Sequence, residues 1–155
     1  MLVHTEMPAR RGQDWFDLEL TADKTNSIVK DKEMDANYYN GKAFVFKRYK
    51  TARKHGVQVV NPTKRIVRTI NQLLTLREDQ GIESDYLFLN SRDEKYSNPT
   101  WVRYMKRLFD TSTNGLRKWY VAQHVDNDAV KEAIKISQEM GHSLETQQRD
   151  YAERE

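Results

Sequence analysis

The sequence predicts an α+β fold that is mainly helical, with a small antiparallel sheet placed before the helices. Two observations carry this prediction. Within the first 60 residues, short segments either alternate apolar and charged residues or concentrate β-branched and aromatic residues, as strands do. Beyond them the apolar residues recur at helical spacing, and capping or turn residues separate the segments.

Three strands are expected, at 16–20, 42–50 and 57–60. The first, FDLEL, alternates apolar and charged residues as a half-buried strand does. TARKHG joins the other two, and Gly56 in this turn readily adopts a positive φ. The stretch 21–40 is polar and irregular, and it closes at Asn40-Gly41, a turn signal. The predicted sheet is therefore three-stranded and antiparallel.

Five helices are expected after the sheet, with starts at Asn61-Pro62, Ser97-Asn98-Pro99, Thr113 or Asn114, about Asp128, and Ser143. Between the first two, DYLFLN at 85–90 is expected to be extended, and Gly141 is expected to end the fourth helix. The final helix carries Tyr151. Apolar spacing predicts inward-facing residues at Ile66, Val67, Ile70, Leu73, Leu74, Trp101, Met105, Leu108, Phe109, Leu116, Trp119, Tyr120, Val130 and Ile134.

Composition limits the classes of function. The 155 residues, 37% hydrophobic and 32% charged, suffice for one globular domain. No apolar run approaches a membrane span and no signal peptide begins the chain, so we expect a soluble intracellular protein without a membrane partner. The absence of cysteine excludes disulfides and thiolate chemistry, and the four histidines lack metal-binding spacing. The net charge of +3 suits a polyanionic partner.

Several basic residues stand at turns and helix starts. PARRGQD places Arg10 and Arg11 on a turn before the first strand, and Lys50 lies at the end of a strand. TNGLRKWY places Arg117 on the first turn of a helix, where the helix N-terminus itself attracts an anion. Each residue taken alone reads as an exposed charge, and their order and spacing are what point to a function.

Taken in order, these motifs resemble the catalytic domain of the tyrosine recombinases, the phage-integrase type of site-specific DNA recombinase. MGHSLETQQRDY is similar to the family's glycine-histidine turn followed by the nucleophilic tyrosine. FKRYKTARKHG looks like its lysine-bearing β-hairpin, and NGLRKWYVAQ like its second-arginine box. The resemblance covers nearly the whole chain, and MPARR is closer in style to integrases of viruses and mobile elements than to bacterial chromosome-dimer resolvases.

The resemblance assigns the first-box arginine to Arg11. In the family's common form an acidic residue follows that arginine three positions later, and Asp14 stands at this distance from Arg11 and not from Arg10. The second arginine is Arg117. By the same resemblance, Lys50 is the general acid for the departing 5′-oxygen.

The resemblance gives the end of the chain its chemical role. Tyr151 attacks the scissile phosphate and forms a 3′-phosphotyrosine, and His142 donates to the phosphate or orients the tyrosine. A phenol with a pKa of about 10 needs a base or a cationic pocket, and Arg11 and Arg117 would supply the pocket. The scheme requires no metal and no cofactor.

One position departs from the family's pattern. Three residues before the second arginine the family usually has histidine, and this chain has Asn114. An asparagine amide donates to a phosphate oxygen but does not accept a proton from the tyrosine. His124, two turns beyond Arg117, is a poor substitute. Slow chemistry is therefore plausible, and a non-catalytic DNA-binding module on the same fold stays open as the alternative, beside DNA relaxation like that of type IB topoisomerases.

The resemblance also implies partners. We expect double-stranded DNA, bound in part by six basic residues near the hairpin and its surroundings, namely Arg10, Lys47, Arg48, Arg53, Lys54 and Lys64. Family members ordinarily have an N-terminal core-binding domain, which has no counterpart in residues 1–155. We therefore expect a fragment of a longer protein that assembles as a homotetramer on DNA, with the isolated domain monomeric.

Overall fold

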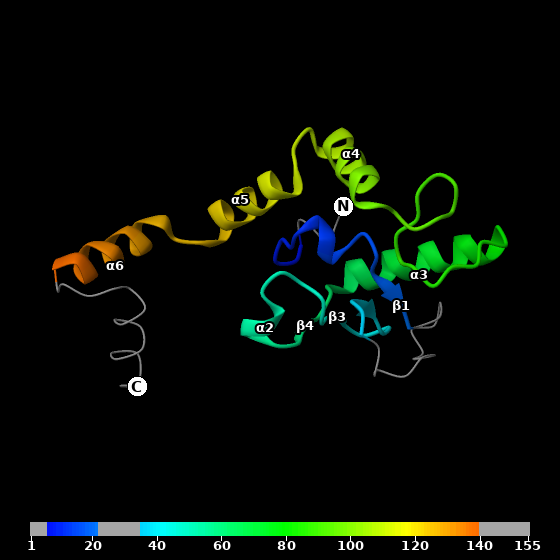
Figure 1. Cartoon of the computed structure of the whole chain (residues 1–155), viewed down its shortest axis with the longest axis horizontal. Helices are drawn as coiled ribbons and strands as arrows, with labels where there is room; N and C mark the ends of the chain where they lie inside the picture. The colour runs from blue at the N-terminus through cyan, green and yellow to red at the C-terminus, as the bar shows by residue number, and fades with distance from the viewer. Residues whose placement is uncertain (1–5, 22–34, 140–155) are drawn as a thin grey trace. The chain divides into compact units, whose positions relative to one another are not determined.

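The computed structural model describes residues 6–21 and 35–139, and Figure 1 shows the order of its elements. The chain divides into two compact units, Met1–Lys118 and Trp119–Glu155, with the boundary inside one helix. The first unit contains the sheet and the hydrophobic core. The expected last helix, from Ser143 onward, lies outside the described residues, and so do Gly141, His142 and Tyr151.

The sheet has four strands in the order β1-β2-β3-β4, namely β1 Glu19–Leu20, β2 Tyr38–Tyr39, β3 Phe44–Phe46 and β4 Gln58–Val60. β1 pairs with β2 in parallel, and the other two pairs are antiparallel. The prediction of three antiparallel strands was therefore wrong, although the mixed α+β class is confirmed. The missed strand is the pair Tyr38–Tyr39, whose two rings are buried at the end of a stretch that reads as polar and irregular.

Both predicted turns of the hairpin region are confirmed. Asn40 accepts at Oδ1 from the backbone N–H groups of Lys42 and Ala43, and Gly41 adopts φ 84°. The TARKHG segment forms a short helix, α2 Ala52–His55, and Gly56 follows it at φ 67°. These turns fix the direction of the chain on both sides of β3.

In the described part of the chain, four longer helices follow the sheet: α3 Lys64–Asp79, α4 Asn98–Phe109, α5 Thr113–His124 and α6 Asn127–Glu139. α4 starts where Ser97-Asn98-Pro99 predicted, with Ser97 as its cap. α3 starts later than Asn61-Pro62 predicted because Thr63 is the cap and accepts from the N–H of Ile66. At α6, Asp126 Oδ1 accepts from the backbone of Asp128 and Ala129.

The core is built around the sheet and the inner faces of α3 and α4. Trp15 is fully buried and meets the rings of Phe44 and Phe46 edge-on, each with centroids 5.2 Å apart. Ile66 of α3 and Trp101 of α4 belong to the same cluster. The remaining members are Met7, Leu18, Leu20, Tyr39, Ile70, Leu87, Met105 and Leu116.

Four residues predicted to face inward are exposed. Leu108 lies beside the α4 stripe formed by Trp101 and Met105, because the stripe repeats every four residues. In the second unit, the predicted inward-facing residues that are exposed include Trp119, Val130 and Ile134. Among the described residues, this unit contributes no side chain to the core cluster, so helical spacing alone did not bury them.

The segment 85–90 crosses back to the sheet edge. Tyr86 forms a single antiparallel bridge with Glu19, and Leu89 forms another with Lys95. The buried guanidinium of Arg77 donates to the carbonyls of Tyr86 and Leu87 across 2.9 and 2.7 Å, which fastens the segment to the end of α3. No helix in the described part of the chain has the length and apolar character needed to cross a bilayer.

Candidate functional site

A cavity of about 340 Å³ in the first unit brings three arginines together. We call it the arginine pocket. Its lining residues come from the turn before η1 (Gly12–Asp14), from the hairpin and from α5, and they are Ala9, Arg10, Arg11, Asp14, Tyr49, Thr51, His55, Gln58 and Arg117. The two first-box arginines therefore share one cavity with the second-box arginine from a distant part of the chain.

Gly12 explains how these segments come so close. A Cβ at this position would lie 2.9 Å from Cδ1 and from Nε1 of Trp101 and 3.3 Å from Cγ2 of Thr113. Because Gly12 has no side chain, η1 packs directly against α4 and against the start of α5. This contact brings the turn that carries Arg10 and Arg11 to the helix that carries Arg117.

Arg10 is held by partners on every side. Its Nε donates to Asp14 Oδ2 across 3.1 Å and its Nη1 donates to Gln58 Oε1 across 2.7 Å. The guanidinium carbon lies 3.8 Å above the ring centre of Phe46 and 5.0 Å from that of Tyr49. Burial lowers the pKa of Arg10, and the neighbouring Asp14 carboxylate opposes that shift. Arg10 is thus a fixed part of the pocket wall.

Asp14 is the acidic member of the pocket. Burial raises its pKa, with the charge of Arg10 acting in the opposite direction. Its Oδ1 is buried and has no hydrogen-bond partner among the described residues. The spacing to Asp14 led us to choose Arg11, but the Asp14 carboxylate pairs with Arg10. This pairing leaves Arg11 available for another anion.

Arg11 and Arg117 differ from Arg10 in their contacts. Neither forms an ion pair with any residue that the structure describes, and both are partly exposed. Arg117 Nη1 donates to Asn114 Oδ1 across 3.3 Å, so the asparagine amide positions the guanidinium. Two guanidiniums that form no ion pair with a described residue, at a cavity whose one carboxylate is paired with Arg10, form a site suited to a phosphate-like anion.

Lys50 is adjacent to the pocket without lining it. Its neighbours Tyr49 and Thr51 line the cavity, whereas its own side chain is exposed. Arg11 and Arg117 therefore line the arginine pocket, whereas Lys50 lies next to it. Tyr151 and His142 lie outside the described residues.

The basic residues expected at DNA are spread over several elements. Lys47 Nζ lies 5.6 Å from the ring centre of Tyr38. Arg10 belongs to the arginine pocket, as described above. The others are exposed, on the hairpin, on α2 and at the start of α3, and they are Arg48, Arg53, Lys54 and Lys64. Their placement around the hairpin is compatible with contacts to a phosphate backbone.

Sequence reasoning missed four polar lining residues of the hairpin, which are Tyr49, Thr51, His55 and Gln58. Tyr49 donates its hydroxyl to the Gly56 carbonyl across 2.7 Å and closes the turn. Gln58 holds Arg10. These residues are close to Lys50 in the sequence, and this closeness could have identified them. Residues of one hairpin lie near one another, so a site residue on the hairpin predicts that its sequence neighbours also line the site.

The described residues contain no group of three His, Asp or Glu side chains that could hold a metal ion. Comparison of the chain with protein-family models, with characterised proteins and with solved structures finds no match.

Proposed function

We propose that this chain is the catalytic domain of a site-specific DNA recombinase or integrase, which cuts and rejoins DNA through a covalent 3′-phosphotyrosine. The supporting observation is the shared position of Arg11 and Arg117 at the arginine pocket. The two residues lie far apart in the sequence of the first unit, and the resemblance to the tyrosine recombinases implies that they meet at one phosphate.

The proposed reaction begins with a phosphodiester held by both guanidiniums. Tyr151 loses its phenolic proton to water and attacks phosphorus, the bond to the 5′-oxygen breaks, and that oxygen leaves with a proton from Lys50, which regains one from water. The arginines neutralise the charge that develops on the non-bridging oxygens. Attack by a 5′-hydroxyl on the phosphotyrosine reverses the step and rejoins a strand without an external energy source.

Asn114 determines how fast the proposed cleavage is expected to be. As a partner of Arg117 it orients a phosphate ligand, but it does not accept the proton of Tyr151. We therefore propose that cleavage of duplex DNA is slow. By resemblance to the family, we also propose that the protein acts as a tetramer on DNA. The second candidate is a DNA-binding module that has lost its chemistry, and Asn114 is the observation that favours it.

A library of nicked suicide duplexes with randomised sequence tests the proposal, because such a library offers the protein many candidate cleavage sites at once. After incubation, the protein that carries covalently bound DNA is recovered under denaturing conditions and the attached strands are sequenced. The proposal predicts an adduct in which Tyr151 is joined to a 3′-phosphate. It also predicts enrichment of particular sequences among the attached strands.

Two substitutions provide the controls. Tyr151→Phe should abolish the adduct, and Tyr120→Phe on α5 should leave it intact. Binding to duplex DNA without any adduct would support the binding module instead. Relaxation of a supercoiled plasmid without recombination between sites would support topoisomerase activity.

A further inference from the structure

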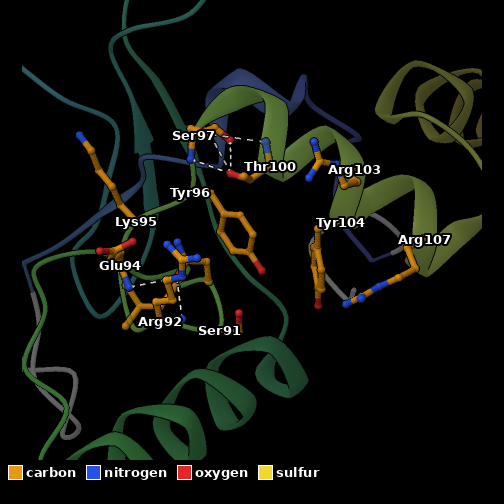
Figure 2. Close-up of a pocket in the computed structure, with 12 residues that line it drawn as sticks. Ser91, Arg92, Glu94, Lys95, Tyr96, Ser97, Thr100, Arg103, Tyr104 and Arg107 are labelled. Carbon is orange, nitrogen blue, oxygen red and sulfur yellow. Dashed lines mark hydrogen bonds between the residues drawn. The ribbon is translucent and has the colours of Figure 1, made fainter.

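The first unit contains a second, larger cavity of about 800 Å³, formed by the loop before α4 and by the outer side of that helix. Figure 2 shows its lining, in which Tyr96 and Tyr104 lie between arginine side chains. None of its lining residues belongs to the arginine pocket. We call it the tyrosine pocket, and the catalytic scheme proposed above makes no use of it.

The two tyrosines form a partly exposed aromatic platform. Their ring centroids are 5.4 Å apart with an angle of 37° between the planes, and Trp101 supports Tyr96 edge-on at 5.2 Å. Their hydroxyl groups point to the same side of the cavity in Figure 2. Rings placed in this way offer both a stacking surface and hydrogen-bonding groups.

Three arginines give the platform its charge. Arg92 belongs to the loop, and Arg103 and Arg107 extend from successive turns of α4 (Figure 2). No ion pair joins any of the three to a described residue, and the Arg107 guanidinium lies 6.0 Å from the ring centre of Tyr104. Among the lining residues the sole carboxylate is that of Glu94. The pocket therefore favours an anion.

The helix N-terminus does not account for this preference. Ser97 and Thr100 cap each other at the start of α4, since Thr100 Oγ1 accepts from the N–H of Ser97 and Ser97 Oγ accepts from the N–H of Thr100. The cation-bearing side chains and the aromatic rings remain as the features that select a ligand. A ligand that uses both must have a flat ring and a negative charge.

We propose that the tyrosine pocket binds an unpaired nucleotide of a nucleic-acid single strand, with the base against Tyr96 and Tyr104 and the backbone phosphates on Arg92, Arg103 and Arg107. The cavity volume falls within the usual range for small-molecule pockets, about 300 to 1,000 Å³. A duplex would present phosphates alone, because its bases are already stacked on each other. A single strand uses both the rings and the charges.

Fluorescence anisotropy of labelled single strands tests the proposal. The probes are dT15 and a strand of equal length and charge made of abasic sugar-phosphate units. We expect dT15 to bind about 5- to 150-fold more tightly, which is the contribution expected from stacking one base on an aromatic side chain. Equal affinity of the two strands would overturn the base-binding part of the proposal.

Variants of the platform and of the charges separate the two contributions. Tyr104→Ala should abolish the preference for dT15 over the abasic strand, and Tyr104→Phe should retain it. The double variant Arg103→Gln and Arg107→Gln should bind both strands more weakly. The slope of log affinity against log salt concentration should become shallower by about 1.4. Arg68→Gln, on α3 and outside the pocket, is the matched control and should change neither value.

Photochemical crosslinking keeps the test valid if Tyr104→Ala does not fold. A strand carrying 5-iodouracil is irradiated with the unaltered protein, and the attached peptide is identified by mass spectrometry. The proposal predicts attachment at Tyr96 or Tyr104, whereas attachment exclusively elsewhere would overturn it. Tyr151→Phe should bind the same strands equally well, so this inference stands or fails independently of the proposed cleavage activity.

Discussion

Arg10, in the turn before η1, and Asp14, the last residue of η1, form an ion pair, with Nε 3.1 Å from Oδ2 and with 12% and 5% of their side chains exposed. Burial raises the pKa of Asp14 above its usual 3.8. The folded protein therefore binds a proton at the Asp14 carboxyl group more tightly than the unfolded chain does. The contribution of Asp14 to stability is fully present below pH 3.8 and is lost as the pH rises through the raised pKa.

Asp14→Asn should remove this part of the pH dependence. The free energy of unfolding of the unaltered protein should fall relative to that of the variant as the pH rises from 3.8. Urea unfolding of both proteins between about pH 3.5 and about pH 7 measures the difference. Asp79→Asn, on the exposed last residue of α3, is the control and should follow the unaltered protein. Parallel profiles for the unaltered protein and Asp14→Asn would contradict the prediction.

Gly12→Ala should destabilise the first unit by about 1 to 3 kcal/mol, because the new methyl group would lie 2.9 Å from the indole of Trp101. Thermal unfolding measures the loss. In the background of Trp101→Phe the same substitution should cost less, since the smaller ring leaves room. Equal costs in the two backgrounds would show that Trp101 is not the obstacle.

Sequence patterns predicted the helices of the first unit well, because their caps and inward stripes are local features. Ser97 caps α4, and Trp101 and Met105 one turn apart are both buried. Strand β2 was missed because two residues show no alternation, and its pairing with β1 is a long-range property. A pattern of two tyrosines after a polar stretch does not specify a strand.

The site was predictable in part for the same reason. The motifs indicated Arg11 and Arg117 as partners, and both line the arginine pocket. Spacing did not reveal that Asp14 pairs with Arg10, because the distance along the chain does not tell in which direction each of two successive arginine side chains points. The tyrosine pocket has no sequence motif, since its residues come from a loop and from one face of α4.

Arg77→Met should destabilise the protein by about 2 to 4 kcal/mol. The guanidinium is buried and donates to the carbonyls of Tyr86 and Leu87, which would both lose a charged donor. Chemical denaturation measures the change. Arg68→Met, an exposed position on the same helix, should shift stability by less than about 0.5 kcal/mol. A small effect at Arg77 would mean that water replaces the donor.

Arg10 and Arg11 are adjacent in sequence, and the structure predicts opposite consequences for their loss. Arg10→Gln leaves the buried Asp14 carboxylate without its ion-pair partner, so it should lower stability by about 2 kcal/mol. Arg11→Gln removes a partly exposed guanidinium that has no ion pair with a described residue, so the unfolding temperature should hardly change. Thermal unfolding of both variants separates these structural effects.

For DNA binding, Arg11→Gln should have the larger effect of the two variants, whereas Arg10→Gln has the larger effect on stability. If Arg11 contacts a phosphate, Arg11→Gln makes the log–log salt dependence of duplex affinity shallower by about 0.9, the amount expected for one lost contact. Arg10→Gln, compared at a temperature where it is fully folded, should change that slope less, because Asp14 and Gln58 already engage its guanidinium. An unchanged slope for Arg11→Gln together with a shallower one for Arg10→Gln would reassign the first-box arginine to Arg10. The fixed geometry of Arg10 would then be the feature that positions the phosphate for attack.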